Sequence, residues 1–141
     1  MKFIKSVLLI SFLTLSVFTT GQSKSEIIEK GIESRIVYEL FIEEGMKEPV
    51  IEEKEVYNER GELLELIQYN NEGEITKWEK FSYDEDGNLI EQVFLNRKGK
   101  VEKKEVTLYK DGLRTERQFF DSRDRMYKKK IYEYAYRKEN P

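Results

Sequence analysis

The chain has 141 residues, of which 38% are charged, and contains neither cysteine nor histidine. Without these two residue types, the usual zinc sites, thiol nucleophiles, Ser-His pairs and imidazole acid–base catalysis are excluded. The formal net charge of −3 at pH 7 also argues against a protein that binds nucleic acid.

The first 21 residues have the pattern of a secretory signal peptide. Lys2 and Lys5 precede an apolar run over residues 7–18, and small residues place a cleavage site between Gly21 and Gln22. The alternative, an uncleaved membrane anchor, is less favoured because a span needs about 20 mostly apolar residues. We therefore expect an exported protein of the bacterial cell envelope, periplasmic or secreted, with no membrane span after cleavage.

Residues 22–34 form a leader for which two interpretations stay open. Ser23 and Glu26 match a capping box, and isoleucines at 27, 28 and 32 would line one side of a short helix that Gly31 limits. A strand that opens the sheet is the alternative.

A β-sheet domain is expected over residues 35–141. Residues 35–43 are rich in β-branched and aromatic side chains and are expected to form the first strand. A turn follows, and residues 50–57 are expected to form the second strand. Further strands are expected over 62–69, 74–83, 88–95, 100–109, 113–120 and 125–136.

One motif recurs along this domain: an aromatic or aliphatic residue, a polar turn that ends in glycine, and an aliphatic residue. It reads "YDEDGNL" in Tyr83–Leu89 and recurs at 57–63, 69–75 and 95–101, with altered copies at 109–113 and 120–126. A type I turn with a glycine bulge explains it, because glycine adopts φ > 0 at little steric cost. Tyr83 would then face Leu89 across the hairpin. The expected turn residues are Gly61, Gly73, Gly87, Gly99, Gly112 and Asp124.

The spacing of the motifs indicates a repeat of two hairpins. The motifs begin at residues 57, 69, 83, 95, 109 and 120, so the unit spans 26 residues. All steps but the last are even, which predicts that the first residues of the motifs share one face of the sheet. The shortened motif predicts a two-residue type I′ turn at Asp111-Gly112, with Tyr109 opposite Arg114.

The strand centres carry charge on both faces, which excludes a β-sandwich because each of its sheets needs one continuous apolar face. We expect an all-β antiparallel meander of about seven or eight strands, elongated and largely single-layered. The alternative is a half-closed barrel that buries the face with Tyr57, Leu63, Tyr69, Ile75, Tyr83 and Leu89.

At these turns the chain resembles a known group. The pattern "Y-D-x-x-G-x-L", intact in Tyr83–Leu89 and with Asn for Asp in Tyr57–Leu63, is similar to the YD repeats of recombination-hotspot and teneurin proteins. It is also similar to the β-hairpin repeats of MORN-like antitoxin-type proteins. The resemblance covers about residues 50–136. It implies a non-catalytic repeat sheet, to which neither group contributes catalytic residues.

Two sets of residues are candidates for binding. Aromatic residues Trp78, Phe81 and Phe94 would form a platform for a glycan, although cross-strand packing is their commoner role. Basic and aromatic residues alternate near the end of the chain, where a protein partner or an envelope surface would bind: Tyr127, Lys128, Lys130, Tyr132, Tyr134 and Tyr136. No cofactor or metal site is expected.

The charge is unevenly distributed along the chain. Residues 22–99 carry 20 acidic and 10 basic side chains, whereas residues 100–141 carry 8 acidic and 13 basic ones. Such a chain can associate head to tail. We therefore expect an exported, non-catalytic β-repeat protein that acts as a protein-interaction or structural module. A carbohydrate-binding module is the alternative, and a carboxylate-dependent hydrolase is the least favoured.

Overall fold

The computed structural model describes residues 23–42, 45 and 48–137, so the expected signal peptide lies outside the described residues. In this part of the chain, one short helix, α1 (Lys24–Lys30), precedes eight strands. The strands are β1 (Ser34–Glu39), β2 (Val50–Tyr57), β3 (Leu63–Tyr69), β4 (Ile75–Tyr83), β5 (Leu89–Leu95), β6 (Val101–Lys110), β7 (Leu113–Asp121) and β8 (Met126–Ile131).

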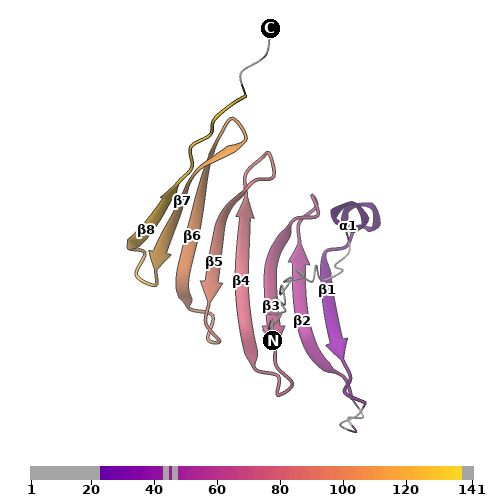
Figure 1. The fold of residues 1–141 in the computed structure, drawn as a ribbon. Coiled ribbons are helices and arrows are strands. Elements are labelled where there is room, and N and C mark those ends of the chain that lie inside the picture. The colour runs from indigo at the N-terminus through magenta and orange to yellow at the C-terminus, as the bar shows by residue number, and fades with distance from the viewer. Residues whose placement is uncertain (1–22, 43–44, 46–47, 138–141) are drawn as a thin grey trace, which may run out of the picture.

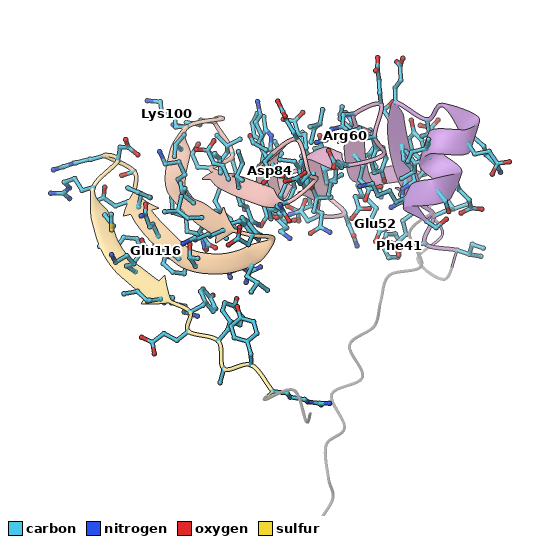
Figure 2. All side chains as sticks on the ribbon, turned by 90° about the horizontal axis from the view of Figure 1, so that it is seen from above. Phe41, Glu52, Arg60, Asp84, Lys100 and Glu116 are labelled. Atoms are coloured by element: carbon cyan, nitrogen blue, oxygen red, sulfur yellow. The ribbon has the colours of Figure 1, made fainter. Side chains whose placement is uncertain are left out.

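The eight strands form a single antiparallel sheet in which each strand lies beside its neighbours in sequence, from β1 to β8 (Figure 1). The predicted meander is therefore confirmed. The sheet is open, with β1 and β8 at its two ends, and the half-closed barrel is wrong. Within the described residues the chain has one layer, since side chains project from both faces of the sheet without a second sheet to cover them (Figure 2).

The leader forms a helix rather than a strand. Ser23 and Glu26 complete the capping box through a bond from the Glu26 backbone N–H to Ser23 and one from the Ser23 N–H to Glu26. Gly31 ends the helix at φ 60°. The helix packs against the turn between β2 and β3, where Ile28 lies close to Gly61.

The predicted hairpin registers are confirmed. Tyr83 lies opposite Leu89, and the first and last residues of the other five-residue turns pair in the same way: Tyr57 with Leu63, Tyr69 with Ile75, Leu95 with Val101, and Phe120 with Met126. Tyr109 pairs with Arg114, and both Asp111 and Gly112 have positive φ, as a type I′ turn requires.

The prediction that the first residues of the motifs share one face is wrong. The register shifts by one residue beside every one of these hairpin turns, which means that each turn is followed by an extra residue. Because side chains alternate with period 2, one extra residue moves the next motif to the opposite face. Two turns restore the face, so the motifs alternate: Tyr57, Tyr83 and Tyr109 lie on one face, and Tyr69, Leu95 and Phe120 lie on the other.

We name the two faces by residues of β4. The Glu79 face also carries Tyr57, Tyr83, Glu105 and Phe119, whereas the Trp78 face carries Tyr69, Leu95 and Phe120. The Glu79 face is the more buried of the two. Glu79, Glu105 and Thr107 are buried there, and Phe119 is only 7% exposed. Side chains of neighbouring strands, rather than a second layer, provide this burial.

Tyrosines one unit apart join neighbouring strands at the end of the sheet where α1 lies. The Tyr83 hydroxyl donates to the carbonyl of Leu63 (3.0 Å), and the Tyr109 hydroxyl donates to that of Leu89 (3.3 Å). Tyr134 continues the series by donating to the carbonyl of Arg114 (2.7 Å). It does so from beyond β8, which ends at Ile131 instead of the predicted residue 136.

Candidate interaction edge

Strand β8 is the last strand of the open sheet, and every one of its side chains is exposed. Its inner side pairs with β7, from Ile131 opposite Glu116 to Met126 opposite Phe120. Just beyond the strand, the Tyr132 N–H donates to the carbonyl of Thr115 (3.0 Å). Backbone groups in an antiparallel pair point alternately toward and away from the partner strand. Those of Lys129 and Ile131 therefore point outward.

Two lysines of β8 cover Phe119, the buried phenylalanine of β7. The Nζ of Lys128 lies 4.4 Å from the centre of the Phe119 ring, and the Nζ of Lys130 lies 5.9 Å from it. The guanidinium carbon of Arg117 is at 5.5 Å, and the Tyr127 ring packs at a centroid distance of 6.4 Å. This cation–π cluster places positive charge along β8 on the Glu79 face.

Arg114 holds the segment after β8 against the sheet. Its guanidinium carbon lies 5.5 Å from the centre of the Tyr132 ring, and its carbonyl accepts the Tyr134 hydroxyl. The Arg114 guanidinium also lowers the pKa of the Tyr132 phenol through a hydrogen bond. Its Nε is buried, and no hydrogen-bond partner lies within reach among the described residues.

The six residues predicted from sequence to bind a partner are thus divided by the structure. Lys128, Lys130 and Tyr132 lie with Phe119 and Arg114 on the Glu79 face. Tyr127 lies beside this cluster at the bulge of β8, Tyr134 docks on β7, and Tyr136 is exposed. Sequence reasoning missed Phe119, Arg114 and Arg117. The register of the last hairpin, which places Phe119 opposite Lys128, was the signal that could have found them.

The three aromatic residues expected to bind a glycan do not form one surface. Trp78 lies on the opposite face of β4 from Phe81, and Phe94 pairs with Glu79 on the face of Phe81. The Trp78 ring N–H donates to Glu65 (2.7 Å), and the Nζ of Lys103 covers the Phe94 ring at 3.9 Å. A single flat ligand cannot contact all three.

The most buried carboxylates of the sheet are paired with cations. Glu79 lies 3.2 Å from the Nζ of Lys77, and Glu105 forms an ion pair with Arg117. Glu62 accepts hydrogen bonds from Asn58 and Arg60, which together with Lys24 lower its pKa. Nowhere in the described part of the chain do three or more acidic side chains lie where they could hold a metal ion.

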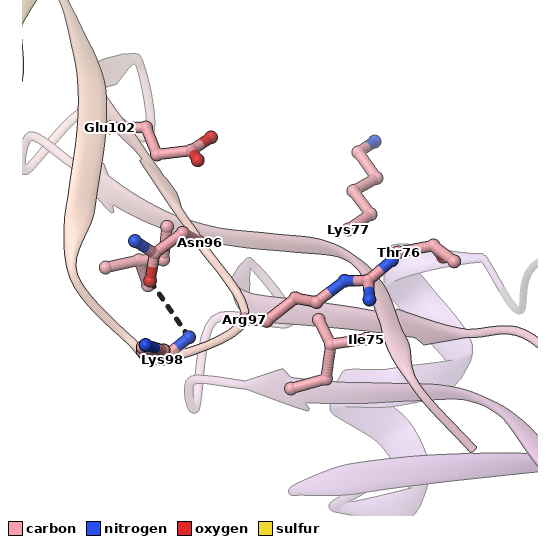
Figure 3. A pocket seen from close by; sticks show the side chains of 8 residues that line it. Ile75, Thr76, Lys77, Asn96, Arg97, Lys98 and Glu102 are labelled. Atoms are coloured by element: carbon pink, nitrogen blue, oxygen red, sulfur yellow. Dashed lines mark hydrogen bonds between the residues drawn. The ribbon is translucent and has the colours of Figure 1, made fainter. Parts of the chain in front are cut away.

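A surface groove of about 470 Å³ lies at the turn end of the sheet opposite α1. It is lined by Ile75, Thr76, Lys77, Leu95, Asn96, Arg97, Lys98 and Glu102. Figure 3 shows Arg97 extending toward Ile75 and Thr76, while the Asn96 side chain accepts a hydrogen bond from the backbone N–H of Lys98 (2.9 Å). Arg97 also forms an ion pair with Glu74 (3.2 Å), which joins this turn to the neighbouring one. None of the predicted binding residues lines the groove.

No helix in the described residues is long and apolar enough to cross a membrane. Comparison of the chain with family models, with curated proteins and with solved structures found no match.

Proposed function

We propose that this chain is an exported, non-catalytic protein-interaction module that binds a partner strand along the outer edge of β8. The observation that carries the proposal is the open edge itself. Outward-pointing N–H and C=O groups at Lys129 and Ile131 are a template for β-strand addition. Exposed side chains at every β8 position leave room for a partner.

The side chains of β8 add selectivity to this backbone template. Lys128 and Lys130 are held over Phe119 on one face, and Ile131 is 66% exposed on the other. A partner strand with acidic residues on one side and an apolar residue on the other suits this edge. The main-chain bonds would supply affinity, and the alternating side chains would supply specificity.

No catalytic step is part of the proposal. The chain lacks cysteine and histidine, and the buried carboxylates Glu79 and Glu105 each have a cationic partner. A hydrolytic pair would instead need two carboxylates in environments that separate their pKa values.

Capture of partners by two variants of Ile131 tests the proposed edge. The full chain carries a tag after Pro141, is expressed with its own first 21 residues, and is lightly crosslinked in the cell. Ile131→Ala removes the side chain but keeps the outward N–H, whereas Ile131→Pro removes both. Proline is tolerated on an edge strand whose N–H faces solvent, so the sheet is retained.

We expect Ile131→Pro to abolish capture of a stoichiometric partner and Ile131→Ala to reduce it only partly. Far-UV circular dichroism of both variants checks that the sheet is intact. Equal capture by Ile131→Pro and the unmodified chain would reject strand addition at β8.

Export is tested separately by the mass of the mature protein. A chain recovered outside the cytoplasm and beginning at Gln22 supports the proposal, because the cleavage site lies between Gly21 and Gln22. Recovery of the intact chain from the cytoplasm alone would contradict it.

A further inference from the structure

Exposed apolar side chains gather at both open edges of the sheet. Beside the β1 edge these are Ile36, Tyr38, Leu40 and Ile42, and beside the β8 edge they are Met126, Tyr127, Ile131, Tyr134 and Tyr136. The strands between them contribute only Val56, Val101 and Leu108 to the large exposed apolar side chains of the described residues. A surface of this kind marks an interaction site.

We infer that the partner strand of β8 is β1 of a second copy of this chain. Copies would then join head to tail, with the sheet continuing from one copy into the next. The inference rests on the proposed function, because it names the partner that the β8 edge binds.

The topology of the sheet allows this continuation. Because the sheet has eight antiparallel strands, its first and last strands run in opposite directions (Figure 1). A second copy placed in the same orientation therefore brings its β1 antiparallel to β8. Helix α1 lies at the start of β1 and toward its outer side, and it does not run along the rest of the strand (Figure 1). In the described residues, no strand pairs with the outer side of β1.

The backbone groups of the two edges match. The carbonyl of Glu33 accepts the Tyr57 N–H (2.8 Å), so odd-numbered residues of β1 direct their backbone groups toward β2. Those of Ser34, Ile36 and Tyr38 point outward by alternation. The outward residues of β8 and of β1 both have their side chains on the Trp78 face. Pairing them therefore keeps the two faces continuous between copies.

Charge restricts the register, and the register that we infer places Ile131 opposite Ile36. If Ile131 lies opposite Ile36, then Lys128 lies opposite Glu39 and Lys130 lies opposite Val37. A slip of two residues toward the start of β1 would place Lys130 opposite Arg35, which like-charge repulsion disfavours. In the inferred register, Ile131 pairs with Ile36 on the Trp78 face, and Lys128 pairs with Glu39 on the Glu79 face.

The lysines also oppose the symmetric alternative. Two β8 strands paired with each other would bring Lys128, Lys129 and Lys130 of both copies together, and like charges that face each other are destabilising. The acidic region over residues 22–99 and the basic region over 100–141 favour contact between unlike ends instead. Contacts between unlike surfaces form rings or open filaments, according to the rotation between copies.

Introduced cysteines test the register, since the chain has none of its own. Val37→Cys and Lys130→Cys are prepared as separate full chains, mixed, and oxidised with copper-phenanthroline. In the inferred register these residues form a non-hydrogen-bonded pair with Cα atoms about 4.5 Å apart, close enough for a disulfide. We expect a covalent dimer of the two variants from the mixture and little dimer from either variant alone.

The matched control is a mixture of Val37→Cys with Lys128→Cys, whose cysteines share a face but lie two residues out of register. It should give at least fivefold less dimer. Equal yields from the two mixtures, dimer from a single variant, or no dimer at concentrations up to those of crystallisation would overturn the inference. If the inference fails in this way while Ile131→Pro still abolishes partner capture, the edge binds another protein and the proposed function stands.

Discussion

The ionisation of Asp121 is coupled to the folding of the turn before β8. Its Oδ1 accepts from the backbone N–H groups of Arg123 and Arg125, and its Oδ2 accepts from the Arg125 side chain. The Arg125 guanidinium, with these backbone bonds, lowers the pKa of Asp121 to about 2. Asn96 uses the same two backbone bonds without a charge in the equivalent turn before β6.

Replacing Asp121 by Asn should therefore keep the turn and remove the charge. Because the folded pKa is lower than the ordinary 3.8, the carboxylate stabilises the fold above pH 3.8 and this contribution is lost as the pH falls toward about 2. The free energies of unfolding of the two proteins, measured in urea, should differ at pH 6 and converge by about pH 2. A constant difference over this range would contradict the assigned cause.

Gly61 and Gly73 occupy equivalent turn positions with different surroundings. Both have positive φ, 67° and 78°. A Cβ at Gly61 would lie 2.9 Å from the carbonyl oxygen of Lys24 in α1, whereas nothing lies within 4 Å of one at Gly73. Gly73→Ala carries only the strain of the left-handed conformation, about 1–2 kcal/mol.

Gly61→Ala should cost more than Gly73→Ala, because α1 must also move. We expect an additional loss of about 1 kcal/mol or more in the free energy of unfolding, with reduced protection of the α1 amides from hydrogen exchange. Equal losses in the two variants would show that α1 does not depend on this contact.

At the scale of the elements, the tyrosine hydroxyls connect one strand to the next. Tyr83→Phe removes the bond to the Leu63 carbonyl and should lower the free energy of unfolding by about 0.5–1.5 kcal/mol. Tyr136→Phe is the control, since Tyr136 is 78% exposed. Chemical denaturation measures the free energy of unfolding of both variants. Equal losses would show that the hydrogen bond of the Tyr83 hydroxyl does not stabilise the sheet.

The turns were predictable from sequence because their cause is local. Glycine at the bulge fixes the turn, and the turn fixes the register of its hairpin, as for Tyr83 and Leu89. The asparagine or aspartate that begins each five-residue turn also belongs to this local code, through bonds such as those from the Arg60 and Glu62 N–H groups to Asn58.

The faces and the end of the sheet were not predictable in the same way. The extra residue after each turn leaves no separate mark in the motif, yet it decides that Tyr69 and Tyr83 lie on opposite faces. Residues 132–136 have strand-like composition, but the described chain beyond Ile131 docks through Tyr132 and Tyr134 without continuing β8. Composition alone predicted that the end of the sheet is the candidate binding edge. Which of its residues point outward could be told only from the register of the last hairpin.

At the scale of the whole molecule, a single-layered sheet depends on contacts between neighbouring strands. Among the residues that the structure describes, its end strands have one neighbouring strand each, so joining two copies gives both of them a second neighbour. Such a contact between an acidic and a basic end is weakened by salt, because ions screen exposed charges.

Self-association should therefore fall with ionic strength. Sedimentation velocity at one protein concentration should show larger species at 20 mM salt than at 500 mM salt. Lys128→Glu, which would place like charges opposite each other at Glu39 of the next copy, should give monomer at both salt concentrations. Association that is unchanged by salt and by Lys128→Glu would assign the contact to a different surface.

The most direct test of strand addition at β8 is hydrogen exchange at single amides, measured by NMR at low and high protein concentration. We expect the outward amides of Lys129 and Ile131 to exchange fast in the dilute protein and to slow down on concentration. Those of Ser34, Ile36 and Tyr38 should slow down with them, while Lys128 and Lys130, already bonded to β7, stay protected throughout. Larger species that form without any change at these outward amides would contradict strand addition at β8.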